Sequence, residues 1–338
     1  MKILFYPIIK KDKNITKNPY TFNFIKHLEI SGFSVINKEK PYDFFKSIFF
    51  INKFDLVILN WIEDICDKRY GYIQNLLFFM NFFIWKIFKK KVIWIVHNKI
   101  SHNKKNKFLK IINFYLLSNY ADVIISHSSE GIMFVKTFWK VNTNNKTVYI
   151  DHPTNGIFTK ASSLNRKYDI LIWGNITSYK GVDIFLEKYY KEIHKYNLKL
   201  LIAGKILDNE LKKKLLRFKS SNILINDDFV SNTELKSLIS ESKIILFPYI
   251  GVSTLSSGAM IYSLEHDGKV LGPNIGEFKD LGEREIIFTY GYSENIIEKI
   301  LKILQSHSLN DRQIEEFVKT NTWKNFIDKL NLILKEKK

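Results

Sequence analysis

The sequence predicts an α/β protein of two doubly wound domains, each a parallel sheet with helices on both faces. The first observation behind this fold class is length, because 338 residues exceed what one hydrophobic core usually serves. The second is an alternation of short β-rich apolar runs with longer helical patterns, the order found in parallel sheets. The third is that this alternation stops in a polar stretch at 159–167 and then restarts. We therefore expect two domains joined by a hinge near residues 154–167.

Five strands are expected in the first half, because five short runs are apolar and rich in β-branched or aromatic residues. These runs cover residues 2–7, 54–61, 91–98, 121–128 and 146–153. Helical patterns lie at 19–30, where a proline stands near the start, and at 106–118. These elements define an N-terminal domain at 1–155.

The second half repeats the pattern after the hinge. Strands are expected at 168–174, 198–204, 222–227 and 243–249. Helices are expected at 181–195, 208–219 and 231–241, with a further helix from about Ser257. The second domain then spans 165–315, and residues 316–338 form a C-terminal helix that is expected to pack back on the N-terminal domain.

Charge is unevenly distributed along the chain. The whole sequence carries +18, and residues 1–150 hold 24 Lys or Arg against 10 Asp or Glu. A basic surface of this kind attracts a polyanion, either nucleic acid or an anionic membrane leaflet, and composition does not choose between them. The basic residues are dispersed, and no nucleic-acid recognition motif interleaves them, so a nucleic-acid-binding protein is the third-ranked reading.

The segment 71–91 is rich in aromatic residues and ends in three lysines. Its unbroken apolar part, Leu76 to Phe88, is too short to cross a bilayer, which needs about 20 residues. Two interpretations remain open: an amphipathic helix packed on the sheet, or a helix whose aromatic face enters a membrane interface while lysines meet lipid phosphates. The N-terminus lacks a signal-peptide pattern and Cys66 is the single cysteine, so we expect a cytoplasmic protein.

Ligands of open parallel sheets bind at the carboxyl ends of the strands, so the loops that follow the strands are the places to look for chemistry. No loop carries a dinucleotide fingerprint or a phosphate loop, which disfavours a dehydrogenase or a nucleoside triphosphatase. One loop, 174–181, combines glycines with Lys180, and the run 256–259 places hydroxyls at a helix start. Together they are suited to hold a diphosphate.

The run LIWGNITSYKGVDIFLE at 171–187 resembles the donor segment of retaining glycosyltransferases with the GT-B fold, family 4 and its relatives. The likeness continues in order and spacing over nearly the whole chain, and it is similar to the members that assemble surface polysaccharides. Its further parts are Asn18-Pro19-Tyr20, DLVILNW at 55–61, VIWIVHNKISH at 92–102, FPY with SSGAMIYSLEHDGKVLGPNIGEF within 247–278, and Thr322-Trp323. The implied fold is GT-B, two Rossmann-like domains facing each other across a cleft.

The resemblance assigns candidate residues to the donor. It implies that Lys180 places a cation on the donor phosphates, while a solvated lysine in a turn is the plain alternative. The phosphate-binding helix start matches Ser256, Ser257 and Gly258, against ordinary helix capping. The remaining donor-binding candidates are Gly174, Asn175, Gly181 and Glu277.

A second group of candidates lies in the first half. His97 ends a strand where the family histidine approaches the transferred sugar, so His97 and Lys180 are the catalytic candidates. Asn18, Tyr20 and His102 are the acceptor-side candidates. A capping or structural histidine is the alternative for His97, and a plain helix entry is the alternative for Asn18 and Tyr20. His102 is expected at most to contact the acceptor or a lipid phosphate.

Departures from the family pattern affect the donor site. Asn175 stands where many members have an arginine, so one fixed charge is missing. The glutamate pair that grips the donor is also missing, since its positions hold Leu255 and Ser263. Glu265 lies on a different helix face and cannot be assumed to substitute. Recognition of the ribose is therefore unassigned; Glu277, after Gly276, is a candidate for it, and an exposed surface glutamate is the alternative.

No metal site is expected. The remaining histidines are scattered and lack partners at ligand spacing, namely His127, His152, His194, His266 and His307, and no Asp-x-Asp occurs. Lys180, backbone N–H groups and the helix N-terminus would then stabilise the leaving diphosphate. The resemblance implies retention of the anomeric configuration without a protein base.

The sequence therefore predicts a metal-independent glycosyltransferase, peripheral at the inner face of the cell membrane. It would use no cofactor, and it would transfer a sugar from a UDP- or GDP-linked donor to a lipid-linked or other saccharide acceptor in surface polysaccharide or lipopolysaccharide synthesis. The alternative is a non-catalytic partner subunit that binds the nucleotide sugar and keeps the fold. No nucleic-acid partner is expected.

Overall fold

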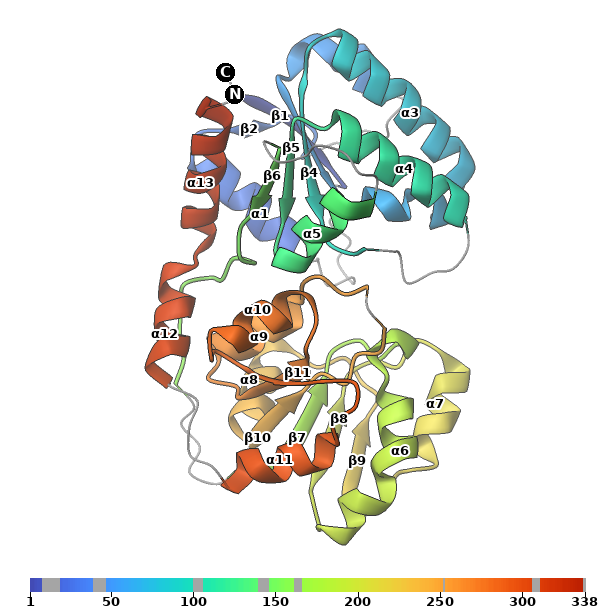
Figure 1. Ribbon diagram of the computed structural model, residues 1–338, viewed down its shortest axis with the longest axis vertical. Coiled ribbons are helices and arrows are strands. Elements are labelled where there is room, and N and C mark those ends of the chain that lie inside the picture. The colour runs from blue at the N-terminus through green and yellow to red at the C-terminus, as the bar shows by residue number, and fades with distance from the viewer. Residues whose placement is uncertain are drawn as a thin grey trace. The chain divides into compact units, whose positions relative to one another are not determined.

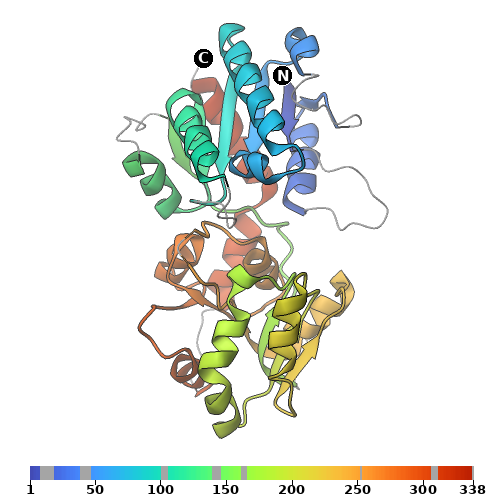
Figure 2. The same cartoon turned by 90° about the vertical axis from the view of Figure 1, so that its right-hand side faces the viewer.

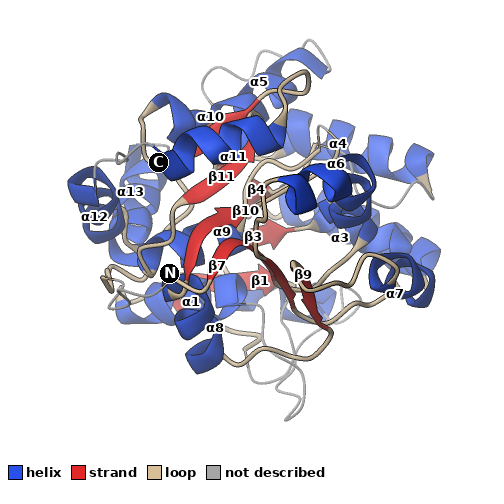
Figure 3. Cartoon of the chain, turned by 90° about the horizontal axis from the view of Figure 1, so that it is seen from below, coloured by secondary structure: helices blue, strands red, loops and turns tan. Residues whose placement is uncertain are grey.

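Two compact units make up the computed structural model, which describes residues 1–7, 19–38, 47–99, 106–138, 146–160, 166–251, 253–305 and 311–336 (Figure 1). The first unit comprises Met1–Asp151, Ser253–Ser256 and Trp323–Lys338, and the second comprises His152–Val252 and Ser257–Thr322. Each unit contains one six-stranded parallel sheet. In Figure 3 the strands, in red, lie among the helices, in blue.

The first sheet has the strand order β2-β1-β3-β4-β5-β6. Every pairing in it is parallel. Its central strands are apolar and buried at nearly every position, as expected for a sheet covered on both faces. The strands are β1 (Lys2–Tyr6), β2 (Ser34–Val35), β3 (Leu56–Asn60), β4 (Lys91–Val96), β5 (Val123–Ser126) and β6 (Thr147–Tyr149).

Helices cover both faces of the first sheet. One core includes α1 (Pro19–Ile30) and α13 (Trp323–Glu336), whose Trp323, Phe326, Ile327, Leu330 and Leu334 recur at helical spacing. The other core includes α3 (Gly71–Ile87) and α4 (Lys107–Tyr120). The remaining elements are α5 (Ser129–Phe138) and the short 3₁₀ segments η1 (Ile48–Lys53) and η2 (Ile62–Asp67). The C-terminal helix α13 thus belongs to the first unit.

The second sheet has the order β12-β11-β10-β7-β8-β9, again entirely parallel. Its strands are β7 (Tyr168–Trp173), β8 (Leu200–Ala203), β9 (Ile223–Asn226), β10 (Ser242–Leu246), β11 (Val270–Pro273) and β12 (Phe288–Tyr290). From β7 the chain winds outward through β8 and β9, and it returns to β10 to wind the other way. The topological switch point therefore lies between β7 and β10, where ligands bind in doubly wound folds.

The helices of the second unit fall into two layers. The core on one face includes α6 (Val182–Lys195), α7 (Asn209–Leu216) and α11 (Ile296–Gln305). The core on the other includes α8 (Asn232–Ser240), α9 (Gly258–Glu265), α10 (Gly276–Glu283) and α12 (Asp311–Thr320). Side-chain caps fix the starts of α7 and α8, because Asp208 and Ser231 accept backbone N–H groups of these helices.

The predicted fold class and all nine predicted strands are confirmed, with the strands one to several residues shorter than expected. The strands β2, β11 and β12 were not predicted. Within the described ranges, no helix is both long and apolar enough to cross a membrane.

Candidate functional site

The loop after β7 places a lysine in a buried position at the switch point. Gly174 has φ +94°, and the chain then runs through η3 (Ser178–Lys180) to Gly181, which has φ +65° and precedes α6. These left-handed conformations favour glycine. The Lys180 side chain turns back toward the end of β7, where its Nζ donates a hydrogen bond of 2.9 Å to the Trp173 carbonyl oxygen.

The ammonium of Lys180 is 5% exposed, and no described carboxylate forms an ion pair with it. Burial lowers the pKa of Lys180 to about 8. A β-carbon on Gly174 would lie 2.9 Å from Nζ, so the glycine makes room for the ammonium. A buried charge without an opposite charge is costly, and an anion bound beside it would offset that cost.

The Gly181 turn packs closely on the segment that follows β10. A β-carbon on Gly181 would lie 2.4 Å from the Pro248 carbonyl oxygen, and the Ile250 N–H donates to the Tyr179 carbonyl at 3.1 Å. The lysine loop and the β10 loop are therefore held together at the carboxyl ends of adjacent strands.

The start of α9 lies in the same region of the second unit. Ser257 is its N-cap, and the Ser257 side chain accepts a hydrogen bond from the Met260 N–H at 3.3 Å. The Trp173 indole donates to the Ser263 hydroxyl at 3.0 Å, which connects the end of β7 to α9. The predicted residues Gly174, Lys180, Gly181, Ser257 and Gly258 are thus brought to one edge of the second sheet.

Glu277 is held by hydrogen bonds inside the second unit. It is fully buried at the start of α10, and its two carboxylate oxygens accept the backbone N–H groups of His152 at 3.1 Å and Ser257 at 3.3 Å. The carboxylate therefore positions the start of α9, and its assignment as a ribose ligand stays a prediction.

The two positions of the missing glutamate pair also have structural roles. Leu255 is fully buried in the core of the first unit, and Ser263 bonds to Trp173. Glu265 accepts hydrogen bonds from the backbone and side chain of Asn155, so it does not replace either glutamate.

His152 was not selected from the sequence, yet it lies at the start of α9. Its Nδ1 donates to the Pro153 carbonyl at 3.1 Å, which leaves Nε2 as the unprotonated ring nitrogen of the neutral form. Nε2 lies 3.8 Å from where a β-carbon on Gly258 would stand. No sequence signal indicated this placement, because it depends on the fold of the hinge.

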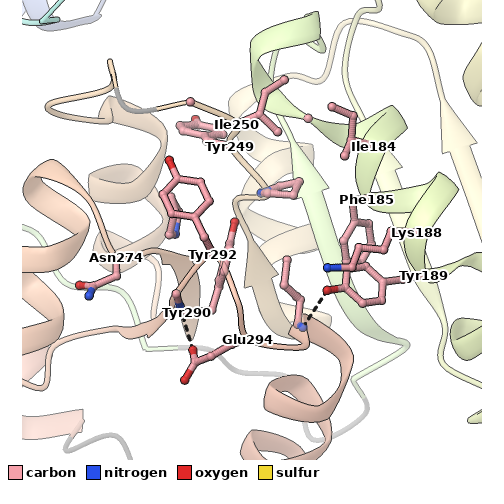
Figure 4. A pocket seen from close by; sticks show the side chains of 16 residues that line it. Ile184, Phe185, Lys188, Tyr189, Tyr249, Ile250, Asn274, Tyr290, Tyr292 and Glu294 are labelled. Atoms are coloured by element: carbon pink, nitrogen blue, oxygen red, sulfur yellow. Dashed lines mark hydrogen bonds between the residues drawn. The ribbon is translucent and has the colours of Figure 1, made fainter.

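A cavity of about 290 Å³ lies beside the Gly181 turn (Figure 4). Aromatic rings form much of its wall, and Lys188, Asn274 and Glu294 add polar groups; the rings belong to Phe185, Tyr189, Tyr249, Tyr290 and Tyr292. Two of these rings are fixed by their hydroxyls. Tyr189 accepts the Ile296 N–H at 3.2 Å, and Tyr290 donates to the Phe247 carbonyl at 3.0 Å. The cavity was missed in the sequence because its wall residues come from α6, from α11 and from the three separate segments at the ends of β10, β11 and β12.

In the first unit, His97 belongs to a cluster of aromatic rings. It stacks on Trp61, with ring centroids 4.1 Å apart, and contacts Tyr20 edge to face. Its Nε2 lies 3.1 Å from Asn60 Oδ1, while the Asn60 amide donates to the Tyr6 carbonyl. That second bond orients the amide oxygen toward His97, so Nε2 carries the proton.

Tyr20 connects His97 to a second histidine. His127 is fully buried, and burial lowers its pKa to about 4, so it is neutral near pH 7. Because its Nδ1 donates to the Ile150 carbonyl, Nε2 must accept, and the Tyr20 hydroxyl donates to it at 2.8 Å. The structure therefore brings His97, a catalytic candidate, and Tyr20, an acceptor-side candidate, together in one cluster.

The other predicted residues are more dispersed or lie beyond the description. Asn175 is exposed directly after Gly174, and Ser256 belongs to the first unit. Asn18 and His102 lie outside the described residues. Among the residues that the structure does describe, no three His, Cys, Asp or Glu side chains gather in a way that could hold a metal ion.

Comparison with known proteins supports the fold of the chain. No protein-family model matches the chain, and no curated protein matches it in sequence. Solved structures do match, at low identity. HepE from Anabaena in complex with UDP-glucose has a TM-score of 0.62 at 11% identity, covering 100% of this chain and 98% of HepE.

Two further structures match over nearly their full length. Sucrose-phosphate synthase from Thermosynechococcus elongatus has a TM-score of 0.68 at 12% identity, covering 99% of this chain and 98% of that one. A glycosyltransferase from Rickettsia africae has a TM-score of 0.63 at 16% identity, with 98% and 97% covered. The chain has the GT-B fold of two Rossmann-like domains, and its structural neighbours are GT-B glycosyltransferases.

Proposed function

We propose that this protein is a glycosyltransferase that uses a nucleotide-sugar donor, UDP- or GDP-linked. The observation that carries the proposal is Lys180, a buried ammonium with no carboxylate partner in the described chain, beside a glycine loop and near a helix start at the switch point. A donor diphosphate supplies the negative charge that this arrangement lacks. HepE, a structural neighbour, is seen in complex with UDP-glucose, which is compatible with this use of the fold.

In the proposed site, Lys180 and the N-terminus of α9 both act on the diphosphate. The ammonium would form a charge-assisted hydrogen bond, and N–H groups at the helix start would contribute a further positive field. Both groups strengthen their interaction as the leaving diphosphate gains charge, so they favour the transition state. Glu277 and Trp173 act through other residues: Glu277 holds the start of α9 through the Ser257 N–H, and Trp173 connects α9 to the end of β7 through Ser263.

The cavity beside Gly181 would hold one ring of the donor. Binding pockets for drug-sized ligands are roughly 300–1,000 Å³, so a cavity of about 290 Å³ suits a single ring system rather than a whole nucleotide sugar. Its aromatic walls offer flat faces, and Lys188, Asn274 and Glu294 offer hydrogen-bond partners.

The reaction that we propose retains the anomeric configuration and needs no metal. The acceptor hydroxyl oxygen bonds to the anomeric carbon, the bond from that carbon to the diphosphate breaks, and the hydroxyl proton passes to the departing phosphate. The resemblance to family 4 supports retention, and no residue has to act as a base. We propose as acceptor a lipid-linked or other saccharide in surface polysaccharide or lipopolysaccharide synthesis, met at the inner face of the cell membrane.

A non-catalytic partner subunit that binds the nucleotide sugar is the second candidate, favoured by the missing glutamate pair. A thermal-shift screen of UDP- and GDP-linked sugars tests binding first, since a ligand at 100 times its Kd raises the free energy of unfolding of the protein by about 2.7 kcal/mol. Donors that bind are then incubated with lipid-linked and soluble saccharide acceptors, and nucleoside diphosphate release is followed. Release that depends on acceptor supports the enzyme, binding without release under any acceptor supports the partner subunit, and no binding at all contradicts both.

A further inference from the structure

Helix α3 has two apolar faces, and only one of them is buried in the core of the first unit. Phe78, Phe82 and Trp85 are fully buried in the core of the first unit. A second stripe points to solvent at the spacing of successive helical turns. It consists of Tyr72, Ile73, Leu76, Met80, Phe83 and Ile87, which are 48% to 75% exposed.

Helix α4 extends this exposed stripe. The two helices lie side by side on the first unit (Figures 1 and 2), and a buried hydrogen bond of 2.7 Å joins Asn113 on α4 to Asn75 on α3. On α4, Phe108, Ile111 and Tyr115 are 41% to 73% exposed, again at spacings of three and four residues. We call these nine residues of the two helices the α3–α4 face. An exposed apolar area of this extent marks an interaction site in a protein that folds as a single chain.

The charges on and around α3 and α4 indicate which kind of partner binds the α3–α4 face. Neither α3 nor α4 contains an aspartate or glutamate, and exposed lysines stand at the end of α3, at Lys89, and at the start of α4, at Lys107. Lys86 is less available, because it pairs with Asp122 at 2.8 Å. Residues 1–150 as a whole hold 24 basic and 10 acidic residues.

We infer that the α3–α4 face docks the first unit on an anionic lipid bilayer. Leucine, isoleucine and aromatic rings on two helices that contain no aspartate or glutamate, with lysines at the helix ends, form the pattern of helices that lie in a membrane interface. The apolar side chains enter the boundary between headgroups and acyl chains, and the lysines meet lipid phosphates. Membrane binding is inferred from the α3–α4 face alone. Only the purpose of this binding, to bring the enzyme to a lipid-linked acceptor, rests on the proposed function.

Sedimentation with liposomes tests the inference. The vesicles are phosphatidylcholine alone or mixed with phosphatidylglycerol, across a salt series. Wild type should pellet with the anionic vesicles at low salt and less as salt rises, because the Debye length shortens from about 10 Å at 0.1 M to about 3 Å at 1 M. A Leu76→Ser/Phe83→Ser variant should lose at least about tenfold in partitioning at every salt concentration. A Lys89→Ser/Lys107→Ser variant should lose mainly the salt-dependent part.

Matched controls separate docking from folding and from sugar transfer. Leu207→Ser/Phe229→Ser removes two side chains that are equally exposed, at 63% and 61%, but belong to the second unit, and it should pellet like wild type. Thermal melting checks that the variants fold. Nucleoside diphosphate binding, measured on the same samples, should be unaffected by Leu76→Ser/Phe83→Ser, so a failure of the proposed function is visible separately.

Three results would overturn the inference. The first is wild type that stays in the supernatant with anionic vesicles even at low salt, and the second is a Leu76→Ser/Phe83→Ser variant that pellets as well as wild type. The third is a lipid-free dimer in analytical ultracentrifugation that this variant converts to a monomer, which would assign the face to a second copy of the chain.

Discussion

Lys180 is held in a position where its charge state depends on what binds beside it. Burial lowers its pKa to about 8 in the free protein, and a bound diphosphate would raise that pKa by favouring the charged form. By linkage, the affinity for diphosphate is then highest below pH 8, where Lys180 is charged in the free protein. It falls as the pH rises above 8, by up to about tenfold per pH unit, until the pKa of Lys180 in the complex is reached.

Calorimetric titration of a nucleoside diphosphate from about pH 7.5 to about pH 9.5 checks this dependence. The phosphates of the ligand add no titration of their own there, because the second ionisation of a phosphate lies near pH 6. In a Lys180→Met variant the affinity should be weak and nearly independent of pH. A wild-type affinity that stays constant over this range would mean that the ammonium does not contact the anion.

His97 is predicted to act on the sugar rather than on the nucleotide. The His97→Ala variant should reduce turnover more than nucleoside diphosphate affinity, since the nucleotide site that we propose belongs to the other unit. His27→Ala is a suitable control, because His27 is a partly buried histidine of the first unit, hydrogen-bonded to the Asn23 carbonyl. Parallel losses of turnover and affinity, or an unfolded variant, would indicate that His97 is structural.

Sequence reasoning placed Lys180 correctly at a strand end because glycines and a cation in one loop are a local signal. It could not place Glu277, whose burial depends on the His152 N–H, 125 residues earlier in the chain. In the sequence, a glutamate at a helix start looks like an exposed residue. His152 was overlooked for the same reason, because its neighbour Gly258 is distant in the chain.

Among the elements, the cavity between α6 and the loops after β10, β11 and β12 offers a test that spares the phosphate site. Ile184 on α6 lines it and is 46% exposed, so Ile184→Trp should fill much of the cavity without disturbing the core. Donor affinity should fall by at least about tenfold if a ring of the donor binds there, because the new side chain occupies its volume.

Glu187→Trp is the matched control, since Glu187 is exposed on the same helix but does not line the cavity. It should leave donor affinity unchanged. Equal affinities for the two variants, with both proteins folded, would remove the cavity from the donor site.

Strands were predictable from the sequence where their apolar stretch was long and continuous. The runs that became β3 and β4 are continuous apolar stretches, and they are confirmed as central strands. The strands β11 and β12 escaped prediction because β11 contains Gly272 and Pro273 and β12 has only three residues. The segment 71–91 gave two interpretations, since one aromatic run cannot show which rings face the sheet; the structure gives α3 a buried and an exposed apolar stripe.

At the scale of the whole molecule, the two units carry different chemistry on the same architecture. Each is a six-stranded parallel sheet, yet residues 1–150 hold a net charge of +14 out of +18. The exposed apolar stripes of α3 and α4 lie in the first unit, and the buried lysine and the aromatic cavity lie in the second. This division agrees with one unit for membrane and acceptor and another for the donor.

The proposed glycosyltransferase function depends most on the binding of a donor diphosphate by Lys180 in the second unit. Calorimetric titration of UDP and GDP into wild type, Lys180→Met and Lys191→Met measures this directly; Lys191 is an exposed lysine of α6 and serves as the control. Wild type and Lys191→Met should bind one of the two nucleotides with equal affinity. Lys180→Met should bind it roughly 10- to 150-fold more weakly, the loss of a charge-assisted contact of about 1.5–3 kcal/mol. Equal affinity in the folded Lys180→Met variant, or no binding of either nucleotide to wild type, would contradict the account.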